Sequence, residues 1–560
     1  MRGRERDQNA AETGGRDGAR VPPNIVEVDL QSGDEQEADQ AELRDEVAAV
    51  RRSLKKVKAG RTEKDAADKL ADDGRHPHAA RELSESESGG EHDRRLQQHH
   101  APQDKLLRAM RDHILFAING REHRVGGREI FATLANWLRY DAGATGTKIV
   151  CEEGDCGACT VLIRRSTKEE FVPVNSCILS LCQLDGASIV TVEGIRMNAV
   201  QQSMIAHHGA QCGYCTPGFV VAMCGLFETC DRVTEKQVRD GLTGNLCRCT
   251  GYEPIIKAAL AVDGKSMSKL RDVYPGVPNA RDAVRIDNFF APATMEDAVR
   301  FKGENPGCTI LQGGTDVGVW INKRHFQAPA MLLLGKIAGL ADISEKKNQI
   351  SVGANVSLAA FEAFIRDRIP ELYRILNIFG SPQIKYAGTL AGNIANGSPI
   401  GDTLPYLLVA DAQLELTGTG GTRTVPINSF YRGYKQFDLR PDEIITRVFV
   451  PVIADTVKLY KVSRRKDLDI SAFTAAIRLR MNGRIEDARI AYGGVAPTVV
   501  RLPKTESFLK GKAPSLDVFE RAGELARSEI KPISDVRGSA DYRLQLAENI
   551  LSKFWHEVSA

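Results

Sequence analysis

The distribution of cysteines constrains this 560-residue chain more than any other feature. Eight of its twelve cysteines form two sets of four between residues 151 and 249. The first set is Cys151-x4-Cys156-x2-Cys159 followed by Cys177. Three thiolates from one loop and a fourth from a separate element form the ligand pattern of plant-type [2Fe–2S] proteins. The first set therefore predicts a [2Fe–2S] cluster.

Glycines within the first set support this interpretation. Gly154 and Gly157 lack a Cβ, so the backbone around them can approach an inorganic core closely. Zinc is the alternative metal, but it normally uses paired C-x2–4-C knuckles, which fit this set poorly. Cys182 is the rival to Cys177 as fourth ligand. A helical continuation over 178–184 would instead turn Cys182 inward as an apolar filler.

The second set has a different design, a C-x2-C pair followed by a C-x-C pair, and consists of Cys212, Cys215, Cys247 and Cys249. Apolar periodicity predicts the helices that flank the two pairs, over 199–208, 218–227, 234–242 and 254–260. A small helical bundle would thus gather four thiolates at one end. Zinc remains an alternative here, because the C-x2-C pair suits it and the C-x-C spacing is unusual for either metal. Because the neighbouring first set predicts an iron–sulfur cluster, we favour iron and sulfide over zinc for the second set as well.

Composition excludes several classes of partner. The net charge of +2 gives no reason to expect nucleic acid or an anionic membrane surface. No apolar run approaches the roughly 18–20 residues of a membrane span. Metal-ligating cysteines without an export signal disfavour disulfides and indicate a cytoplasmic protein.

Residues 1–109 form a charged tail that differs from the rest. They are rich in charged residues, Gln and Gly and almost without aromatic side chains, which predicts disorder. A short amphipathic helix over 41–58 is compatible with the spacing of Leu and Val. Our hypothesis is that Met110 lies near the functional start, with the tail an extension or a misplaced start codon.

The remainder divides into five segments by pattern. A hairpin over 113–125, a helix over 133–139 and strands over 161–164 and 188–193 predict a β-grasp module. Alternating short strands and helices follow a polar linker with Pro and Gly. The predicted segments are 110–196 (ferredoxin domain), 197–262 (helical cluster domain), 263–284 (linker), 285–455 (ligand-binding domain) and 456–560 (C-terminal domain).

Two Gly-rich stretches in the second half are candidate ligand sites. Thr309–Gly318 follows a strand, and its backbone N–H groups could meet a pyrophosphate, although a tight structural turn is the alternative and the Rossmann spacing is absent. Gly388–Asp402 reads as a surface loop that approaches a large polar ligand, pinned by Leu390 and Ile394. The basic stretch 460–466 is either solvated or faces an anionic dinucleotide.

Together these motifs resemble the molybdenum hydroxylase family, most closely its xanthine dehydrogenase type, over about 110–558. Cys151–Thr160, Gln211–Gly218 and Gly244–Tyr252 are similar to the family's two cluster signatures. Gly388–Asp402 and Ser463–Arg465 are similar to its FAD domain, which is of vanillyl-alcohol-oxidase type. The resemblance implies an α+β multidomain fold: a β-grasp [2Fe–2S] domain, a helical-bundle [2Fe–2S] domain, an FAD-binding domain and a C-terminal α+β subdomain.

The resemblance also implies site residues. The cluster ligands would be the two cysteine sets, since Asn175-Ser-Cys177 matches the family's position for the fourth ligand of the first set. Phe379 would stack on the isoalloxazine of FAD, and Tyr434 would lie near a nicotinamide. The residues implied to hold the flavin pyrophosphate are Ile310, Leu311, Gln312, Gly313, Gly314, Thr315, Asp316 and Val317. Further implied FAD contacts are Thr389, Leu390, Ala391, Gly392, Asn393, Asp402, Ile445 and Lys461. No acid–base catalyst is assigned to this chain.

The implied activity is electron relay in NAD-dependent xanthine dehydrogenase, an enzyme of purine catabolism. Electrons from hypoxanthine or xanthine hydroxylation at a molybdopterin centre would pass through the two clusters to FAD and then NAD. The molybdopterin would lie on a separate large subunit, in a hetero-oligomer such as a dimer of heterodimers. Aldehyde-, carbon monoxide- and N-heterocycle-oxidising relatives, dioxygen as acceptor, and a non-catalytic metal-binding scaffold or redox sensor remain open alternatives.

Overall fold

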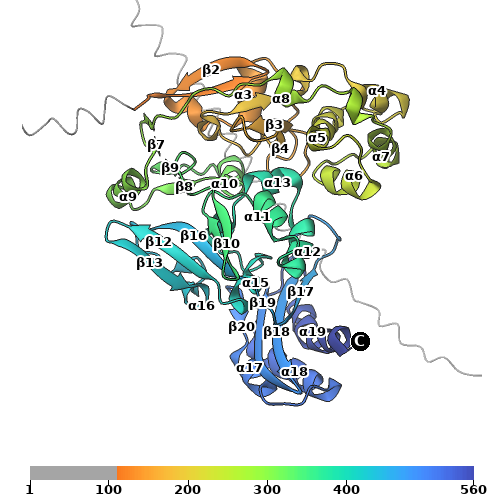
Figure 1. Ribbon diagram of the computed structural model, residues 1–560, viewed down its shortest axis with the longest axis vertical. Helices are drawn as coiled ribbons and strands as arrows, with labels where there is room; N and C mark the ends of the chain where they lie inside the picture. Colours follow the sequence, from red (N-terminus) through yellow and green to blue (C-terminus); the bar gives the residue numbers. More distant parts are fainter. Residues whose placement is uncertain (1–109, 560) are drawn as a thin grey trace, which may run out of the picture. The chain divides into compact units, whose positions relative to one another are not determined.

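The computed structural model describes residues 110–559. The predicted helix over 41–58 and the predicted disorder of residues 1–109 lie outside this range. Within it, no helix combines the length and the apolar character that crossing a membrane requires. Five sheets and their covering helices make a mixed α+β architecture, as predicted (Figure 1).

The first sheet is the predicted β-grasp. Its strands are β1 (His113–Ile118), β2 (Arg121–Gly126), β3 (Thr160–Arg164), β4 (Val172–Asn175) and β5 (Ser188–Val190), in the order β2-β1-β5-β3-β4. Strand β1 is parallel to β5 and antiparallel to β2. Helix α3 (Leu134–Tyr140) begins where predicted, because the hydroxyl of Thr133 accepts a hydrogen bond from the backbone N–H of Asn136.

The fifth strand is shorter than predicted. The sequence predicted a strand over 188–193, but β5 ends at Val190 and a 3-10 turn over Val192–Gly194 follows. The side chain of Asn119 explains the difference, because its Oδ1 accepts the backbone N–H of Thr191 at 3.0 Å. A side chain from the hairpin turn therefore takes the place of a strand partner.

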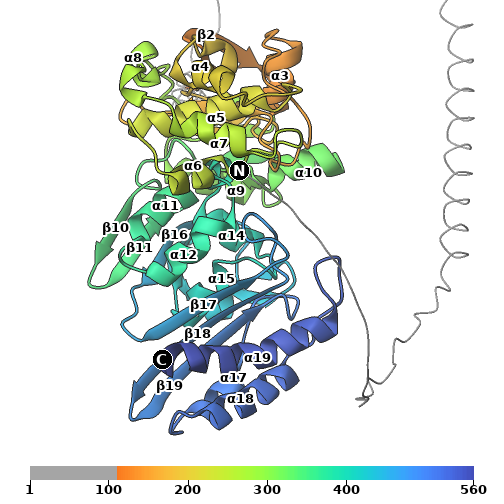
Figure 2. The same ribbon diagram turned by 90° about the vertical axis from the view of Figure 1, so that its right-hand side faces the viewer.

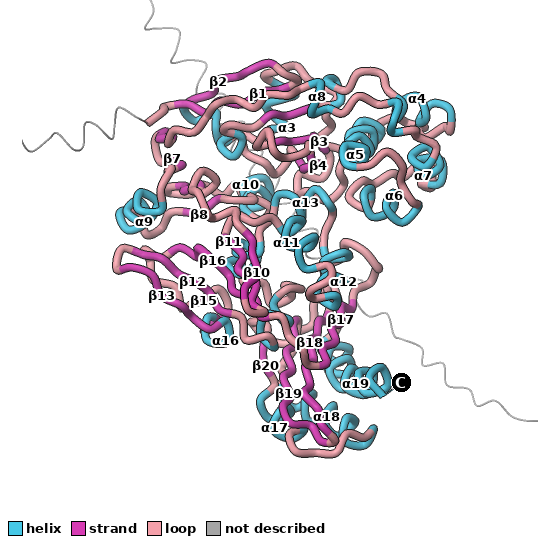
Figure 3. Tube along the Cα trace, viewed as in Figure 1, coloured by secondary structure: helices cyan, strands magenta, loops and turns pink. Residues whose placement is uncertain are grey.

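Four helices follow the first sheet, close to the predicted ranges: α4 (Ala199–Ala206), α5 (Thr216–Thr229), α6 (Glu235–Leu242) and α7 (Glu253–Leu260). Capping boxes at Asn198 and Thr234 fix the starts of α4 and α6. Helix α5 is the apolar centre of this group and packs against β3 and β4 (Figure 3).

The predicted linker over 263–284 is tied to its neighbours. It contains a 3-10 turn (Gly264–Ser266) and the short helix α8 (Leu270–Val273). The buried carboxylate of Glu228 accepts the backbone N–H of Leu270 at 2.7 Å. Beside its end, the carboxylate of Asp185, 1% exposed, pairs with both Arg111 and Lys336. The linker is thus a fixed spacer in this structure.

The second sheet shares its core with the first. Its strands are β6 (Val284–Ile286), β7 (Phe289–Ala291), β8 (Thr309–Leu311) and β9 (Met331–Leu333), in the order β6-β7-β9-β8. Helices α9 (Met295–Glu304) and α10 (Val317–Arg324) connect them. Buried residues of β7 and β9 belong to the same apolar cluster as Phe116 and Trp137 of the β-grasp. This continuous core holds the ferredoxin-like part against the segment that follows the linker.

A third sheet, antiparallel throughout, has the order β10-β11-β16-β12-β13. Its strands are β10 (Ile343–Lys346), β11 (Gln349–Gly353), β12 (Gln413–Gly418), β13 (Gly421–Pro426) and β16 (Ile444–Pro451). The associated helices are α11 (Leu358–Ile365), α12 (Pro370–Phe379), α13 (Pro382–Ala387), α14 (Leu390–Asn396), α15 (Leu404–Val409) and α16 (Ile427–Phe430). A small ribbon pairs β14 (Tyr431–Gly433) with β15 (Gln436–Phe437).

Helix α14 corrects one sequence interpretation. The stretch Gly388–Asp402 was predicted as a surface loop, yet its first half is this helix. The Thr389 hydroxyl caps it by accepting the Gly392 N–H at 3.0 Å, and Gly397 ends it in the left-handed region at φ 56°. Leu390 and Ile394 are fully buried, as predicted, because they lie one helical turn apart on the same face.

The C-terminal part is a four-stranded antiparallel sheet in the order β17-β18-β19-β20. Its strands are β17 (Thr456–Val462), β18 (Phe473–Asn482), β19 (Arg484–Gly493) and β20 (Val500–Arg501). Helices α17 (Pro503–Leu509), α18 (Leu516–Glu529) and α19 (Ala540–Ser559) lie together beside this sheet (Figure 2). Phe519 and Phe554 of the last two helices complete its core.

Candidate redox centre

The first cysteine set lies in a wrapped loop beside the β-grasp sheet. Cys159 and Cys177 are buried, whereas Cys151 and Cys156 are half-buried. The loop needs left-handed backbone at Glu152, Gly154 and Gly157, the last two at φ 81° and 68°. The Asn175 side chain pins the loop by donating to the Gly154 carbonyl at 2.7 Å. Cys177 follows β4 at the same edge, so all four thiols of the first set converge.

The sulfurs of the first set interact with one another. Hydrogen bonds from the thiols of Cys156 and Cys177 hold the pKa of Cys151 well below its usual value. The pKa of Cys177 is raised by its contacts with Cys151 and Cys159. Backbone N–H groups of Asp155 and Cys156 also point at the Cys151 sulfur, each at 3.4 Å. The surroundings therefore stabilise a thiolate at Cys151, the ionised form that binds metal cations.

The donor set, three thiols from one loop and a fourth from a separate element, is of the kind that [2Fe–2S] clusters use. None of the twelve cysteines forms a disulfide. Within residues 110–559, no group of three or more His, Cys, Asp or Glu side chains is arranged to hold one metal ion. Gly154 and Gly157 serve a different purpose from the one predicted, because a Cβ at these positions would meet the Ile178 side chain and the Gly244 carbonyl oxygen. They allow the cysteine loop to pack closely against its protein neighbours.

The second set gathers where two inter-helix loops meet. The Cys212 and Cys249 sulfurs lie 3.5 Å apart. Cys215 and Cys247 are close enough for each to affect the pKa of the other. The Tyr252 hydroxyl accepts the backbone N–H of Cys247 at 3.1 Å, which orients the second loop. The four thiols of this set thus lie together at one end of the helical group. Two of them, Cys212 and Cys249, are exposed.

The two cysteine loops touch each other directly. The backbone N–H of Leu246 donates to the Cys156 carbonyl at 3.0 Å. A Cβ at Gly218, in the first turn of α5, would lie 2.3 Å from the Gly157 carbonyl oxygen. Only glycine permits this approach. The first cysteine loop is consequently packed between α5 and the loop that carries Cys247.

A cavity of about 1420 Å³ opens in the part of the chain that follows the linker. Its volume exceeds that of an ordinary small-molecule pocket and suits a ligand of dinucleotide size. Fifteen of the residues predicted to contact FAD or a nicotinamide line it, and they are Ile310, Gln312, Gly313, Gly314, Thr315, Asp316, Val317, Phe379, Thr389, Ala391, Gly392, Asn393, Asp402, Tyr434 and Ile445.

Three predicted contacts lie elsewhere. Leu311 and Leu390 do not line the cavity and are buried in the apolar cores, at 1% and 0% exposure. Lys461 does not line it either, but its Nζ pairs with the Asp402 carboxylate at 2.7 Å. Both side chains of this pair are almost inaccessible. Lys461 therefore affects the cavity only indirectly, by pairing with the Asp402 side chain that lines it.

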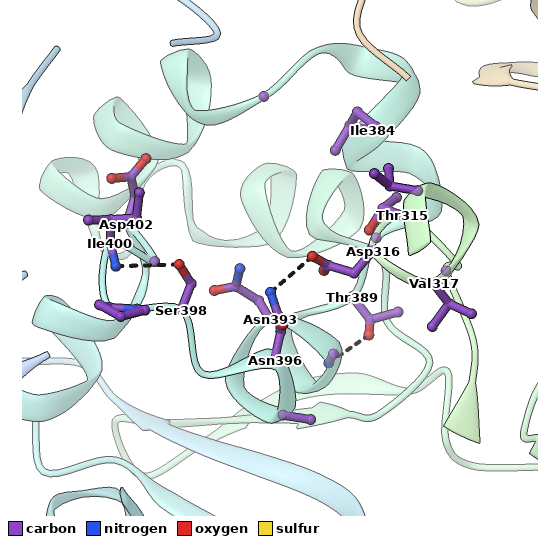
Figure 4. A pocket seen from close by; sticks show the side chains of 18 of the residues that line it. Thr315, Asp316, Val317, Ile384, Thr389, Asn393, Asn396, Ser398, Ile400 and Asp402 are labelled. Carbon is purple, nitrogen blue, oxygen red and sulfur yellow. Dashed lines mark hydrogen bonds between the residues drawn. The ribbon is translucent and has the colours of Figure 1, made fainter. Parts of the chain in front are cut away.

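The two Gly-rich stretches form adjoining walls of the cavity (Figure 4). The first one turns so tightly that a Cβ at Gly313 would lie 2.2 Å from the Ala387 carbonyl oxygen. The Asn396 amide donates to the Asp316 carboxylate at 3.0 Å, which joins the two walls. Helix α10 starts at Val317, so its positive end faces the cavity and favours an anionic ligand group.

The sequence did not predict that the first cysteine loop is part of the cavity wall. Gly154 and Asp155 line the cavity, and Ile384 lines it as well. A Cβ at Gly154 would lie 3.0 Å from Ile384 Cδ1, so the loop and helix α13 are in contact. No periodic signal links these segments, which are far apart in the chain. Residues 468–471 and several between 531 and 543 also line the cavity.

Three family profiles match consecutive parts of the chain. They are described as a [2Fe-2S] binding domain (residues 191–260), an FAD binding domain in molybdopterin dehydrogenase (283–453) and a CO dehydrogenase flavoprotein C-terminal domain (458–558). Xanthine dehydrogenase of Drosophila subobscura is 29% identical over 526 residues, covering 80% of this chain and 39% of the relative. Aldehyde oxidase 1 of Bos taurus is 29% identical over 525 residues, with the same two coverages. The chain thus spans about two fifths of the length of these relatives.

Solved structures with similarity include quinoline 2-oxidoreductase from Pseudomonas putida 86, at 27% identity and a TM-score of 0.45. The match covers 48% of this chain and 94% of that chain. Reconstituted CO dehydrogenase from Oligotropha carboxidovorans matches at 28% identity and a TM-score of 0.45, covering 48% and 95%.

Proposed function

We propose that this chain, an iron–sulfur/FAD electron-transfer module of the molybdenum hydroxylase type, relays electrons from a molybdopterin centre on a partner subunit to FAD. The observation that carries the proposal is the position of the first cysteine loop. Its Gly154 and Asp155 belong to the wall of the large cavity, and its Cys156 carbonyl accepts the N–H of Leu246. Two thiol sets and the cavity are thus contiguous.

In this proposal the clusters, when bound, supply one-electron transfer and FAD supplies the exchange between one-electron and two-electron chemistry. The chain's own residues bind these groups and exclude water. Cys159 and Cys177 lie in an apolar cluster with Ala135 and Ile178, next to Ile384. This apolar contact keeps water from the thiols of Cys159 and Cys177.

The exposure of the two thiol sets supports an order of transfer. Cys212 and Cys249 are exposed, and Tyr214, Leu246 and Tyr252 next to them expose 51%, 45% and 37% of their surface. Exposed apolar surface around a redox site is suited to a protein partner. We therefore place the molybdopterin-binding subunit on the side of the second set, so that the first set receives electrons second and passes them to FAD.

The names of the relatives support a substrate for the partner subunit and a final electron acceptor. Relatives named xanthine dehydrogenase support a purine, hypoxanthine or xanthine, as the partner's substrate, with NAD as acceptor. Tyr434, predicted to lie near a nicotinamide, lines the cavity and is 60% exposed. The equally similar aldehyde oxidase favours an aldehyde as the second candidate.

An anaerobic preparation of the full chain tests the proposal. We expect about four iron atoms and one FAD per chain, as two [2Fe–2S] clusters require. NADH should then bleach the flavin absorbance and afterwards the iron–sulfur absorbance. Protein that contains zinc, or that binds no flavin when FAD is added, would contradict the proposal. Reduction by NADH without purine-dependent NAD reduction in the presence of the partner would favour the aldehyde candidate.

A further inference from the structure

Both cysteine loops contact the part of the chain that bears the cavity through one pair of buried amide side chains, Gln383 and Asn245. Gln383 of helix α13 is fully buried, and Asn245, two residues before Cys247, is 2% exposed. Thr160, directly after Cys159, is also 2% exposed. These three polar side chains come from three different parts of the chain.

Hydrogen bonds connect the three side chains into one network. The Gln383 amide N–H donates to Asn245 Oδ1 at 2.9 Å and to Thr160 Oγ1 at 3.3 Å. The Asn245 amide N–H donates to the Gly157 carbonyl at 3.0 Å, and the Thr160 hydroxyl donates to the same carbonyl at 2.6 Å. The network therefore ends on the backbone between Cys156 and Cys159.

The network lies between all three redox positions. On one side, the residue after Asn245 donates its N–H to the Cys156 carbonyl. On the other side, Ile384 follows Gln383, lines the cavity and contacts Gly154. A shift of the Asn245–Gln383 pair would thus move each cysteine loop relative to the other and to the cavity.

Packing around the pair leaves no room for adjustment. A Cβ at Gly244 would lie 2.1 Å from Gln383 Oε1, and a Cβ at Gly157 would lie 2.1 Å from the Gly244 carbonyl oxygen. Gln383 Oε1 accepts no hydrogen bond, so the buried amide N–H groups of Gln383 and Asn245 hold the network together. Because a buried N–H group that loses its acceptor is unfavourable, the network is expected to keep this arrangement. Close packing and directional hydrogen bonds together fix distances more strictly than apolar contact alone.

We infer that Gln383 and Asn245 are positioning residues, which set the separation of the two thiol sets and hold the first one against the cavity. The inference rests on the proposed function, because the separation matters only if both sets carry clusters. Neither side chain hydrogen-bonds to a thiol. Each acts through the Gly157 carbonyl and through the loop that ends at Cys247.

Two variants and one matched control test this role in the full chain. Gln383→Met keeps the length of the side chain without its amide, and Asn245→Asp keeps the acceptor for Gln383 but loses the donor to Gly157. Asn355→Leu is the control, because the Asn355 amide donates to the Leu334 carbonyl at 2.8 Å, away from both cysteine loops. Iron and FAD content, the magnetic splitting between the two reduced clusters, and the rate at which NADH-reduced flavin equilibrates with the clusters are measured.

We expect both variants to retain iron and FAD but to show an altered splitting and slower equilibration, since both quantities depend on the separation of the redox groups. The control should lose stability with the splitting unchanged. If Gln383→Met fails to fold, Asn245→Asp carries the test. Iron-loaded variants with the wild-type splitting and rate would overturn the inference, whereas a wild-type chain without iron would overturn the proposed function instead.

Discussion

The carbonyl oxygen of Cys156 accepts a 3.0 Å hydrogen bond from the backbone N–H of Leu246. One residue is the second member of the first cysteine set, and the other immediately precedes the third member of the second set. Because the bond uses only backbone atoms, the two loops can be joined in this way whatever the Leu246 side chain is. A change in the conformation of one cysteine loop is therefore expected to move the other loop through this backbone hydrogen bond.

Replacing Cys177 by Ser distinguishes the two candidates for the fourth ligand of the first set. Cys177 is in contact with Cys151 and Cys159, whereas Cys182 is fully buried among apolar side chains, where burial raises its pKa to about 12. Cys177→Ser should lower the iron content from about four to about two atoms per chain. Cys182→Ser should keep all the iron and lose only stability. Equal iron loss in both variants would contradict this assignment.

Gly157→Ala should disrupt both cysteine loops at once. The position has φ 68°, and the added Cβ would lie 2.1 Å from a backbone carbonyl oxygen of the second loop. Gly127→Ala is a matched control, because Gly127 has φ 56° but no atom within 4 Å of the added Cβ. We expect the control to cost about 1 kcal/mol of unfolding free energy, from backbone strain alone. Urea unfolding and iron analysis should show a larger cost and iron loss only for Gly157→Ala.

The sequence predicted the local structure around this candidate site well, for physical reasons. A thiol pattern within one loop, a Thr cap at Thr133 and the apolar face of α5 all depend on residues close in the chain. The cavity wall made by Gly154 and Asp155 depends instead on helix α13 packing against a loop more than two hundred residues earlier. Such a contact leaves no periodic signal. For the same reason, the partnership of Asn245 with Gln383 was not predicted.

Lys461→Met should destabilise the fold around the cavity, because it removes the ammonium partner of the buried Asp402 carboxylate. Burial raises the pKa of Asp402, and the Lys461 ammonium opposes that shift. Without the lysine, the carboxylate stays buried beside only the Ser471 hydroxyl, which donates at 2.6 Å. Removing one partner of a buried ion pair costs about 3–5 kcal/mol.

Lys458→Met, on the same strand, is the control for this variant. Lys458 is one-third exposed and pairs with Glu371, so its loss should cost less than about 1 kcal/mol. Thermal unfolding and bound flavin per chain are the measurements. We expect reduced flavin content for Lys461→Met and wild-type content for Lys458→Met. Wild-type stability and flavin content in both would show that the pair is dispensable.

An acid-sensitive contact holds the segment after α18 next to the cavity. Burial opposes ionisation of Asp535, but hydrogen bonds from Arg543 and the Arg537 N–H, together with both guanidinium charges, lower its pKa to about 2. A depressed pKa stabilises the fold above the unfolded value of 3.8, and this stabilisation is lost as pH falls from about 4 towards 2.

Arg543→Met tests the Asp535 contact by its dependence on pH. The guanidinium is 2% exposed and donates to Asp535 at 2.6 Å and to the carbonyls of Ile533 and Ala472, so the variant should lose about 3 kcal/mol of unfolding free energy near neutral pH. The part of this loss that comes from Asp535 should shrink as the carboxyl protonates below pH 4. Arg527→Met, which breaks an exposed pair with Glu548, should cost little at any pH. A difference between wild type and Arg543→Met that stays constant from pH 5 to pH 3 would mean that the arginine acts only through the two carbonyls.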